Sequence, residues 1–495
     1  MTITVKTGAQ TLALEAAPGE NLGDVLRRAI PTFAQPCGGN HTCGKCRVHI
    51  TGTVPAPSAS DLRLLSEQER DAGVRLACSC PVTDGMTVHL AESGPARIVA
   101  WNKTVPFDRT ETGYGIAADI GTTTVAMQLF DRVSGQVLAE RLEENAQRGF
   151  GADVISRIEA CKTEGLDTLS SRIREQLERM AAACLHEAGI DHIDEAVVTG
   201  NSTMLHLYEG LDPASLAVVP FDVQSYFGCM SRHTLSGAPV YLPRCVGAYV
   251  GADIICAILA AGMQDGGVQL LTDIGTNGEM ALMRDGNLSC CATAAGPAFE
   301  GAGLSCGMPA AAGAIRAVRR EGDKICYQTV QDAPPVGICG SGILDALAVL
   351  LEDETLEDTG YLDEDYTVDG TEVTITQRDV RQIQLAKSAI CAGLITLLEE
   401  QDLPADAVDR FVIAGGFGSS MNMDSACAIG LFPAALRDKA DFIGNGALGG
   451  AAMLLMNRSL RAQSEQMAQN ATEISLSASP DFMDYYVDCM SFMTF

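Results

Sequence analysis

Basic residues are scarce in this 495-residue sequence. Lys and Arg number 34 against 63 Asp and Glu, so the formal net charge is −29. Such an acidic chain repels phosphate backbones and anionic lipid head groups, which argues against nucleic acid and membrane surfaces as partners. No apolar run approaches the length of a membrane span, and the first residues lack the charged-then-apolar pattern of a secretory signal. We therefore expect a soluble, cytoplasmic protein, whose 47% hydrophobic content suffices for two or three packed domains.

Histidine also offers little, because the seven His residues show no metal-binding spacing. Cysteine is the better candidate ligand. Four of the 18 Cys follow the pattern C-x5-C-x2-C plus one distant Cys, at positions Cys37, Cys43, Cys46 and Cys78. Three closely spaced thiolates on a Gly-rich loop cover one side of a small cluster, and a fourth from a remote segment closes the site. The spacing therefore predicts a 2Fe-2S cluster.

Two other uses of these cysteines agree less well with the sequence. A structural zinc site prefers two C-x2-C pairs, and only Cys43 and Cys46 form one. Disulfides require an oxidising compartment, whereas thiols are scattered throughout this chain and a secretory signal is lacking. The other Cys stand mostly singly among apolar or small residues, and we expect them to be small buried side chains.

The residues around the four Cys predict their structural frame. Residues 2–17 alternate as a β-hairpin, and "NLGDVLRRAI" at 21–30 places its apolar residues on one helical face. Further strands are expected near "RVHITG" and "TVHLAE". This ββα start before a Cys loop resembles the α+β, β-grasp 2Fe-2S ferredoxins over about the first 90 residues. In those modules "LAC" after an Arg is the usual closing pattern, which favours Cys78 over the neighbouring Cys80 as the fourth ligand.

Composition divides the chain into four segments. Residues 1–92 hold the ferredoxin-like pattern, while 93–113 lack periodicity and contain two Pro and the only Trp, which predicts a linker. The remainder alternates strand-like and helix-like runs, the signature of an α/β fold. We divide it into lobes at 114–265 and 266–495, because its two parts repeat one pattern.

The repeat is visible in four stretches. "GIAADIGTTTVAMQLFDRVSGQ" around Asp119 is echoed by "QLLTDIGTNGEMALMRDGNLSC" around Asp273. Each has an apolar strand, then Asp-Ile-Gly-Thr, then a second strand ending at a Gly turn. "AVVTGNST" at 196–203 is matched more loosely by "FVIAGGFG" at 411–418. The repeat predicts two half-domains that face each other.

The Asp-Ile-Gly-Thr hairpin has a chemistry of its own. A strand delivers Asp at its end, Gly permits a tight turn, and the hydroxyl and backbone N–H groups suit phosphate oxygens. The Asp reaches Mg²⁺ through the water shell of the metal, since Mg²⁺ keeps several waters. One such hairpin is also ordinary turn structure, but two copies in a repeated context predict a clamp for the phosphates of a nucleotide.

These motifs, with "GICGSGILD" at 337–345, resemble the phosphate, connecting-helix and adenosine motifs of the ASKHA superfamily, which includes sugar kinases and actin. The resemblance implies an α/β, two-lobed ATPase of duplicated RNase H-like fold. An N-terminal 2Fe-2S domain joined to such an ATPase is similar to the reductive activators of corrinoid enzymes, and "ENAQRGFGADVISRI", "GNSTMLHL" and "AAGPAFEGAGLSCGM" are typical of that family. Membership implies that ATP is used to return an inactive Co(II) corrinoid protein to Co(I), so that methyl transfer resumes.

The resemblance also implies roles for individual residues. Asp119, Asp273 and Asp253 are the candidate catalytic residues, although Asp253 either orders an attacking water or only caps a helix. Gly340 and Gly342 either lie at the crossing between the lobes or allow close helix packing. The residues implied to bind nucleotide are Gly121, Thr122, Thr123, Gly275, Thr276, Asn277, Gly415, Gly416 and Gly418.

The implied cofactors are the 2Fe-2S cluster, ATP and Mg²⁺. The implied partners are the corrinoid-binding protein of a methyltransferase system and an upstream electron donor, and a homodimer stays open. Three alternatives in function also stay open. Two are an ASKHA-type kinase and a nucleotide-binding redox scaffold, each with an accessory ferredoxin domain, and the third is a ferredoxin-type electron carrier that does not use ATP. The Gly-rich segment 290–308 either approaches a cofactor of the partner or forms a packed turn.

Overall fold

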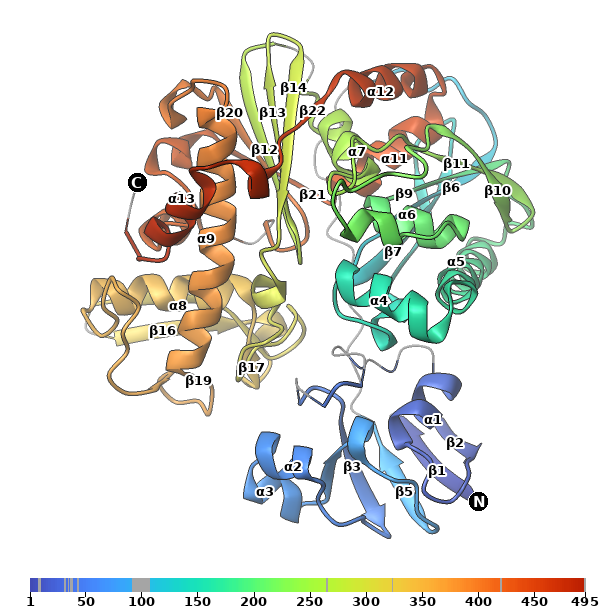
Figure 1. The fold of residues 1–495 in the computed structure, drawn as a ribbon, viewed down its shortest axis with the longest axis vertical. Helices are drawn as coiled ribbons and strands as arrows, with labels where there is room; N and C mark the ends of the chain where they lie inside the picture. Colours follow the sequence, from blue (N-terminus) through green and yellow to red (C-terminus); the bar gives the residue numbers. More distant parts are fainter. Residues whose placement is uncertain are drawn as a thin grey trace.

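The structure is a computed structural model that describes residues 1–7, 10–30, 33, 35, 39–41, 44–90, 107–263, 266–322, 324–418 and 421–493. An N-terminal domain lies at one end of the molecule, and two larger lobes stand side by side beyond it (Figure 1). Within the described ranges, none of the helices combines the length and the hydropathy needed to cross a lipid bilayer. The predictions placed on Cys37, Cys43 and most of the linker fall outside the described residues.

The N-terminal domain is a five-stranded sheet in the order β2-β1-β5-β3-β4. β1 and β2 form the predicted antiparallel hairpin, with Thr2 opposite Glu15, and β5 joins β1 in parallel. Helix α1 buries Leu22, Val25 and Leu26 against the sheet, as its helical spacing predicts. The elements are β1 (Thr2–Thr7), β2 (Gln10–Glu15), α1 (Leu22–Ala29), β3 (Arg47–Gly52), α2 (Ala59–Leu64), α3 (Glu67–Asp71), β4 (Val74–Leu76) and β5 (Met86–His89).

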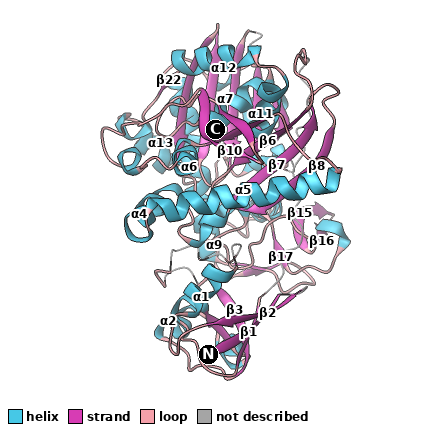
Figure 2. Cartoon of the chain, turned by 90° about the vertical axis from the view of Figure 1, so that its right-hand side faces the viewer, coloured by secondary structure: helices cyan, strands magenta, loops and turns pink. Residues whose placement is uncertain are grey.

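The first lobe is built on a six-stranded sheet in the order β10-β11-β9-β6-β7-β8. Its central strand β6 is covered on both faces, since Ile116 and Ala118 pack in the core beside α5 while Ala117 packs against α11. Figure 2 shows α5 running across one face of this lobe. The elements are β6 (Tyr114–Ile120), β7 (Thr124–Asp131), β8 (Val137–Glu144), α4 (Val154–Glu164), α5 (Leu166–Ala188), β9 (Glu195–Gly200), α6 (Ser202–Glu209), β10 (Cys229–Leu235), β11 (Ala238–Leu242) and α7 (Ala252–Ala261).

The second lobe has a sheet in the order β21-β20-β12-β13-β14-β22, with a smaller β15–β17 sheet and the helices α8 and α9 beside it. The larger elements are β12 (Val268–Ile274), β13 (Gly278–Arg284), β14 (Asn287–Thr293), α8 (Gly340–Glu352), α9 (Gln377–Glu399), β20 (Arg410–Ala414), α10 (Met423–Ala428), β21 (Ala440–Gly444), α11 (Gly446–Met456), α12 (Ser459–Asn470) and α13 (Phe482–Asp488). The remaining strands are β15 (Ala314–Glu321), β16 (Lys324–Thr329), β17 (Gly337–Ile338), β18 (Tyr366–Thr367), β19 (Thr374–Ile375) and β22 (Thr472–Glu473).

The two large sheets repeat one topology. In the first, β6, β7 and β8 form an antiparallel meander, β9 lies parallel to β6, and β11 lies parallel to β9. In the second, β12, β13 and β14 form the meander, β20 lies parallel to β12, and β21 lies parallel to β20. The order β11-β9-β6-β7-β8 therefore matches β21-β20-β12-β13-β14, which confirms the predicted duplicated, two-lobed fold.

The chain returns to the first lobe after β21. Helix α11 packs on β6 and β9, and its Leu448 and Leu455 share a core with Val197. It also lies against α7 so closely that a Cβ at Gly450 would come within 2.0 Å of the carbonyl oxygen of Cys256. Helices α7 and α11 thus form the joint between the lobes (Figure 1).

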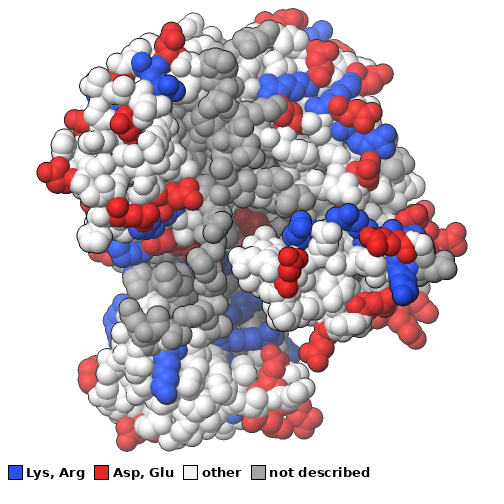
Figure 3. Space-filling view, turned by 180° about the vertical axis from the view of Figure 1, so that it is seen from behind, with Lys and Arg blue, Asp and Glu red and all other residues white. Residues whose placement is uncertain are grey.

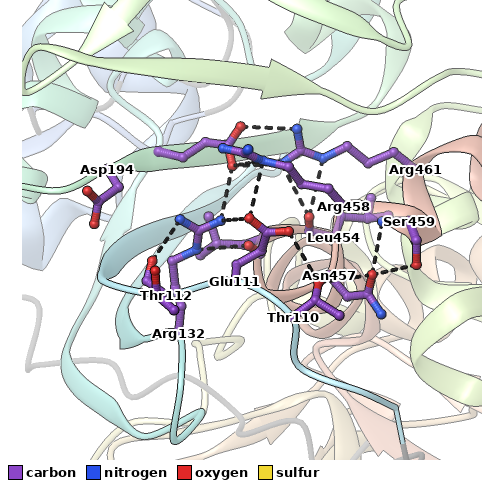
Figure 4. A network of polar contacts seen from close by, with 12 residues as sticks. Thr110, Glu111, Thr112, Arg132, Asp194, Leu454, Asn457, Arg458, Ser459 and Arg461 are labelled. Carbon is purple, nitrogen blue, oxygen red and sulfur yellow. Dashed lines mark hydrogen bonds and ion pairs between the residues drawn. The ribbon is translucent and has the colours of Figure 1, made fainter.

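A buried ion network holds this returning segment in place (Figure 4). The carboxylate of Glu195, at the start of β9, lies 3.3 Å from Arg132, 3.1 Å from Arg458 and 2.9 Å from Arg461. Burial alone would raise the pKa of Glu195, but the hydrogen bonds and charges of Arg461 and Arg458 outweigh it and lower the pKa. Three arginines therefore fasten α12 and β7 to one carboxylate.

Candidate functional site

The two Asp-Ile-Gly-Thr hairpins lie at equivalent places in the two sheets. Asp119 is the last residue but one of β6, beside Ala126 of β7 and Thr199 of β9. Asp273 is the last residue but one of β12, beside Glu279 of β13 and Ala414 of β20. Because β9 lies parallel to β6 and β20 lies parallel to β12, the glycine-rich ends of β9 and β20 lie at the same sheet edges as Asp119 and Asp273. The repeated sequence thus delivers two matching sets of groups to facing ends of the sheets.

The hairpins meet across the gap between the lobes. The hydroxyl oxygens of Thr123 and Thr276 are 3.0 Å apart. The carboxylate of Glu300 accepts hydrogen bonds from both hydroxyls, at 3.0 Å from Thr123 and 2.8 Å from Thr276. Glu300 belongs to the Gly-rich segment 290–308, which the sequence did not assign to the site. The structure therefore adds a carboxylate that bridges the two predicted phosphate loops.

The turn of the first hairpin is further fixed by neighbouring loops. Asn201, the N-cap of α6, donates from its amide to the Thr122 hydroxyl at 3.1 Å. The buried guanidinium of Arg157 donates to the carbonyl oxygen of Thr122. A Cβ at Gly121 would lie 2.8 Å from the carbonyl oxygen of Thr124, so the turn requires glycine there. The loop is held in one shape before any ligand binds.

Carboxylates gather at the base of this site. Burial raises the pKa of Asp119 to about 6, although a 3.1 Å hydrogen bond from Asn445 opposes the shift. Burial, followed by the charges of Asp119 and Glu300, raises the pKa of Asp273 to about 7. Burial and the charges of Asp119 and Asp273 raise the pKa of Asp253. Burial and the charges of these three Asp residues also raise the pKa of Glu279, a residue that the sequence did not single out. The cluster is short of positive charge.

A hydrated divalent cation fits this chemistry. The donor groups are carboxylate oxygens, which Mg²⁺ prefers, and their mutual repulsion falls when a cation lies among them. Within the described part of the chain, no group of three or more His, Cys, Asp or Glu is placed to hold a metal directly. Contact through the waters of the metal is the arrangement that the two hairpin Asp residues suit.

Asp253 lies in the first turn of α7, after the N-cap Gly251. Its Oδ1 accepts a hydrogen bond of 3.0 Å from the backbone N–H of Ile254. The same carboxylate is close enough to Asp119 and Asp273 for their charges to raise its pKa. It thus makes a local helix contact and takes part in the acidic cluster, and its catalytic role stays a prediction.

The predicted adenosine loop follows β20. Gly415 has φ +91°, and a Cβ there would lie 2.5 Å from Oδ1 of Asp273, so glycine is needed for the close approach of the two loops. A Cβ at Gly416 would meet no atom within 4 Å, whereas one at Gly418 would lie 2.6 Å from a side-chain carbon of Ile413. The missing side chain at Gly416 therefore leaves open space, and the one at Gly418 serves packing.

The glycines of "GICGSGILD" serve close packing. A Cβ at Gly340 would lie 1.9 Å from the carbonyl oxygen of Phe299, and one at Gly342 would lie 2.1 Å from that of Ile315. Helix α8 therefore begins directly against the segment that carries Glu300. The ring of Phe299 also stacks on that of Phe417 in the adenosine loop, with centroids 5.0 Å apart.

Two of the four predicted cluster ligands are described, and they lie together. The backbone N–H of Cys78 is 3.5 Å from Sγ of Cys46, and Nδ1 of His41 is 3.3 Å from Sγ of Cys78. Cys80 lies in the same hydrophobic core as Cys46 and Cys78, and burial raises the pKa of its thiol to about 12. The choice of Cys78 over Cys80 as the fourth ligand stays a prediction.

Fold and site together define the class: an iron–sulfur, ferredoxin-like domain joined to a two-lobed ASKHA domain. Three family models match, the 2Fe-2S iron-sulfur cluster binding domain over residues 6–83, the RACo middle region over 114–266, and the C-terminal ASKHA domain of RACo over 267–494. A corrinoid activation enzyme of Eubacterium limosum, RamQ, is 34% identical over 433 residues, which is 79% of this chain and 73% of RamQ. The chain therefore belongs to the RACo family, the reductive activators of corrinoid enzymes.

Two further relatives agree. A protein of Methanosarcina barkeri named [Co(II) methylated amine-specific corrinoid protein] reductase is 26% identical over 424 residues, 77% of each chain. The solved structure of a reductive activator for corrinoid, iron-sulfur protein superposes with a TM-score of 0.71 at 28% identity, covering 99% of this chain and 98% of that one. The predicted order of a ferredoxin domain before an ASKHA domain is thus confirmed.

Proposed function

We propose that this chain is an ATP-dependent reductive activator that passes one electron to the Co(II) corrinoid of a partner protein and so regenerates Co(I) for methyl transfer. The observation that carries the proposal is that the two predicted phosphate hairpins meet at Thr123 and Thr276. The first domain of the same chain places Cys78 beside Sγ of Cys46. The names of the relatives in Eubacterium limosum and Methanosarcina barkeri support the corrinoid protein as the partner. An upstream electron donor re-reduces the protein after each transfer.

The cysteines at 37, 43, 46 and 78 would hold the 2Fe-2S cluster, which supplies a single electron when bound. For a one-electron couple, about 59 mV corresponds to a tenfold change in the equilibrium constant. A donor weaker than the Co(II)/Co(I) couple by a few hundred millivolts therefore needs several kcal/mol from another source. Nucleotide binding and hydrolysis at the hairpins would supply it.

The residues of the cleft divide the work on nucleotide. Asp119 and Asp273 would orient hydrated Mg²⁺, and the hydroxyls of Thr123 and Thr276 would donate to phosphate oxygens. Gly416 would leave space for the adenosine. Asp253 would accept a proton from the attacking water, because burial and the charges of Asp119 and Asp273 raise its pKa toward neutrality, where a general base is effective.

The test is the reduction of a Co(II) corrinoid protein under anaerobic conditions, followed by visible absorbance, with the reduced chain and Mg²⁺-ATP. We expect Co(I) to form with nucleotide and not without it. Asp273→Asn abolishes the conversion, whereas the matched control Asp285→Asn keeps it, because Asp285 is an 82% exposed residue of the same lobe. Phosphoryl transfer to an added acceptor instead would identify a kinase, and nucleotide binding without turnover would identify a redox scaffold.

A further inference from the structure

The N-terminal domain rests on the first lobe through Arg27 of α1. Its guanidinium donates to the carbonyl oxygen of Gly149 at 3.4 Å, lies 5.1 Å from the ring centre of Phe150, and is 3.6 Å from the carboxylate of Glu164. A Cβ at Gly149 would lie 3.2 Å from the Arg27 side chain, so glycine allows this approach. One basic side chain thus makes a hydrogen bond, a cation–π contact and an ion pair.

A second basic residue reaches the other lobe. Lys45, next to Cys46 in the cluster loop, donates from Nζ to the carbonyl oxygen of Leu304 at 3.3 Å. Figure 3 shows Lys and Arg side chains where the N-terminal domain meets the lobes. The ferredoxin domain therefore bridges both lobes, at Gly149–Phe150 on one and at Leu304 on the other.

Each of these two contact points belongs to a loop that also holds a phosphate hairpin. In the first lobe, Asn145 donates from its backbone to the carbonyl oxygen of Thr123 at 2.9 Å and from its side chain to that of Gly121 at 2.8 Å. In the second lobe, Glu300 lies in a turn closed by Ala302 donating to the Pro297 carbonyl oxygen at 3.1 Å, and Leu304 follows this turn by two residues. Contact with the ferredoxin domain and contact with the hairpins are thus properties of the same loops.

Glu300 competes with a phosphate for the same donors. Its carboxylate already accepts the hydroxyl hydrogens of Thr123 and Thr276, which are the groups that a phosphate oxygen would take. Its negative charge would also repel a polyphosphate at this distance. A nucleotide that fills the clamp would therefore move Glu300 aside and displace the segment that joins its turn to Leu304.

We propose that Glu300 couples the phosphate clamp to the ferredoxin domain: nucleotide displaces Glu300 from Thr123 and Thr276, weakens the contact between Lys45 and Leu304, and so releases the ferredoxin domain from the lobes. The inference rests on the proposed function only in requiring that the clamp binds nucleotide. Linkage makes the coupling reciprocal: nucleotide weakens the seating of the ferredoxin domain by the factor by which the seated domain weakens nucleotide binding. Any change that weakens the seat therefore strengthens nucleotide binding.

The reciprocity gives a sharp test at residues remote from the nucleotide. In the full-length protein, Arg27→Ala and Lys45→Ala are each expected to lower the Kd of Mg²⁺-ADP, measured by isothermal titration calorimetry, by roughly threefold or more. The matched control is Arg28→Ala, which neighbours Arg27 on α1 but pairs within its own domain with Glu20 at 2.9 Å, and it leaves the Kd unchanged. The visible absorbance of the cluster checks that the Lys45→Ala variant keeps its iron.

A double-mutant cycle identifies Glu300 as the link. Glu300→Gln lowers the Kd of Mg²⁺-ADP by itself, and in that background Arg27→Ala and Lys45→Ala have no further effect. Hydrogen exchange gives a direct readout: saturating Mg²⁺-ADP increases exchange in α1 and in residues 146–150 of the wild type, and no longer does so in Glu300→Gln.

The outcomes separate the two claims. If the wild type binds Mg²⁺-ADP but Arg27→Ala and Lys45→Ala both keep the wild-type Kd, the coupling is overturned and the proposed function stands. Unchanged exchange in α1 on saturation would also overturn it. If the wild type binds no nucleotide, the proposed function fails and the coupling fails with it.

Discussion

At the scale of single residues, the carboxylates of the proposed nucleotide site reduce the stability of the fold, which is expected where a ligand binds. Asp119, Asp253, Asp273, Glu279 and Glu300 each have a raised pKa, with burial as the largest cause. Carboxylates that disfavour their own ionisation reduce the stability of the folded state once they are charged. Such a cost is common where a charged substrate must later be bound.

The first prediction measures this cost at Asp273. Burial and neighbouring charges raise its pKa to about 7, so the folded state binds this proton more tightly than the unfolded chain, whose pKa is about 4. The folded protein therefore loses stability as the pH rises from about 4 to 7. Without Mg²⁺ or nucleotide, we expect Asp273→Asn to raise the free energy of unfolding by about 2 kcal/mol at pH 8 and by less at pH 5.

Chemical denaturation at the two pH values checks this result. The control Asp285→Asn also removes one negative charge from the second lobe, but its position is 82% exposed, so it changes stability by less than about 0.5 kcal/mol. If Asp273→Asn is no more stable than the wild type at pH 8, the ionised Asp273 carboxylate does not destabilise the folded protein.

A second prediction concerns the fourth cluster ligand. All three of Cys46, Cys78 and Cys80 are buried in one core, but it is Cys78 that lies beside Sγ of Cys46 and Nδ1 of His41. We expect anaerobically purified Cys78→Ala to lose 2Fe-2S absorbance and iron, and Cys80→Ala to keep both. Two irons retained in Cys78→Ala, or zinc in place of iron in the wild type, would contradict the assignment.

Between elements, the sequence was informative where the signal was local and silent where the contact was distant. The duplicated strand–Asp–Gly–Thr pattern predicted hairpins that the structure contains at β6–β7 and β12–β13. Glu300 escaped notice, because it joins the site only through tertiary packing and stands in no motif with metal or phosphate spacing. Glu279 lies opposite Asp273 in the second hairpin, but the first hairpin has Ala126 at the matching position, so the repeat did not mark it. The sequence also did not predict that α11 returns to the first lobe, since "GALGGAAMLLM" is apolar on all sides and its pattern does not indicate which element it packs against.

The joint between elements yields a third prediction at Glu195. Three arginines, Arg132, Arg458 and Arg461, surround its carboxylate and lower its pKa against the effect of burial. The ionised carboxylate of Glu195 stabilises the folded protein at pH values above about 4, which is the pKa of a Glu in the unfolded chain. This stabilisation is lost as the pH falls through the lowered pKa of the folded state. At pH 7 we expect Glu195→Gln to destabilise the fold by about 3 kcal/mol, because it removes the carboxylate partner of the mostly buried Arg461 and leaves the buried Arg132 with Glu111 alone.

The control for Glu195→Gln is Glu187→Gln, which removes a carboxylate that lies 2.6 Å from Arg141 and is 54% exposed. Exposed pairs contribute little, so the loss there is below about 1 kcal/mol. Urea unfolding of both variants at pH 7 makes the comparison. Equal losses in the two variants would mean that the network in Figure 4 does not fasten α12 to the first lobe.

At the scale of the whole molecule, one chain carries both the electron-transfer domain and the nucleotide clamp, and the described contacts between them are few. Phe107 packs on the core beside α11 and Asn457 donates to the carbonyl oxygen of Asp108 at 2.8 Å, so the ASKHA body begins by residue 107. Among the described residues, Arg27 and Lys45 donate hydrogen bonds from the ferredoxin domain to that body. The proposed release of the ferredoxin domain would break these hydrogen bonds, with the covalent connection keeping the domain near.

The last prediction tests that tether. A specific protease site placed at residues 96–100 lets the full chain fold before it is cut, so that each part keeps its own core. Covalent linkage supplies an effective concentration of about millimolar for a short flexible connection, which micromolar fragments in solution lack. After cleavage we expect unchanged 2Fe-2S absorbance and unchanged Mg²⁺-ATP hydrolysis, while the rate of Co(II) corrinoid reduction at about 1 µM protein falls by at least tenfold.

Raising the concentration of both parts restores the rate. A cleaved protein that reduces the corrinoid as fast as the intact chain at 1 µM would mean that the two domains act from a permanent complex and that release of the ferredoxin domain has no part in electron transfer.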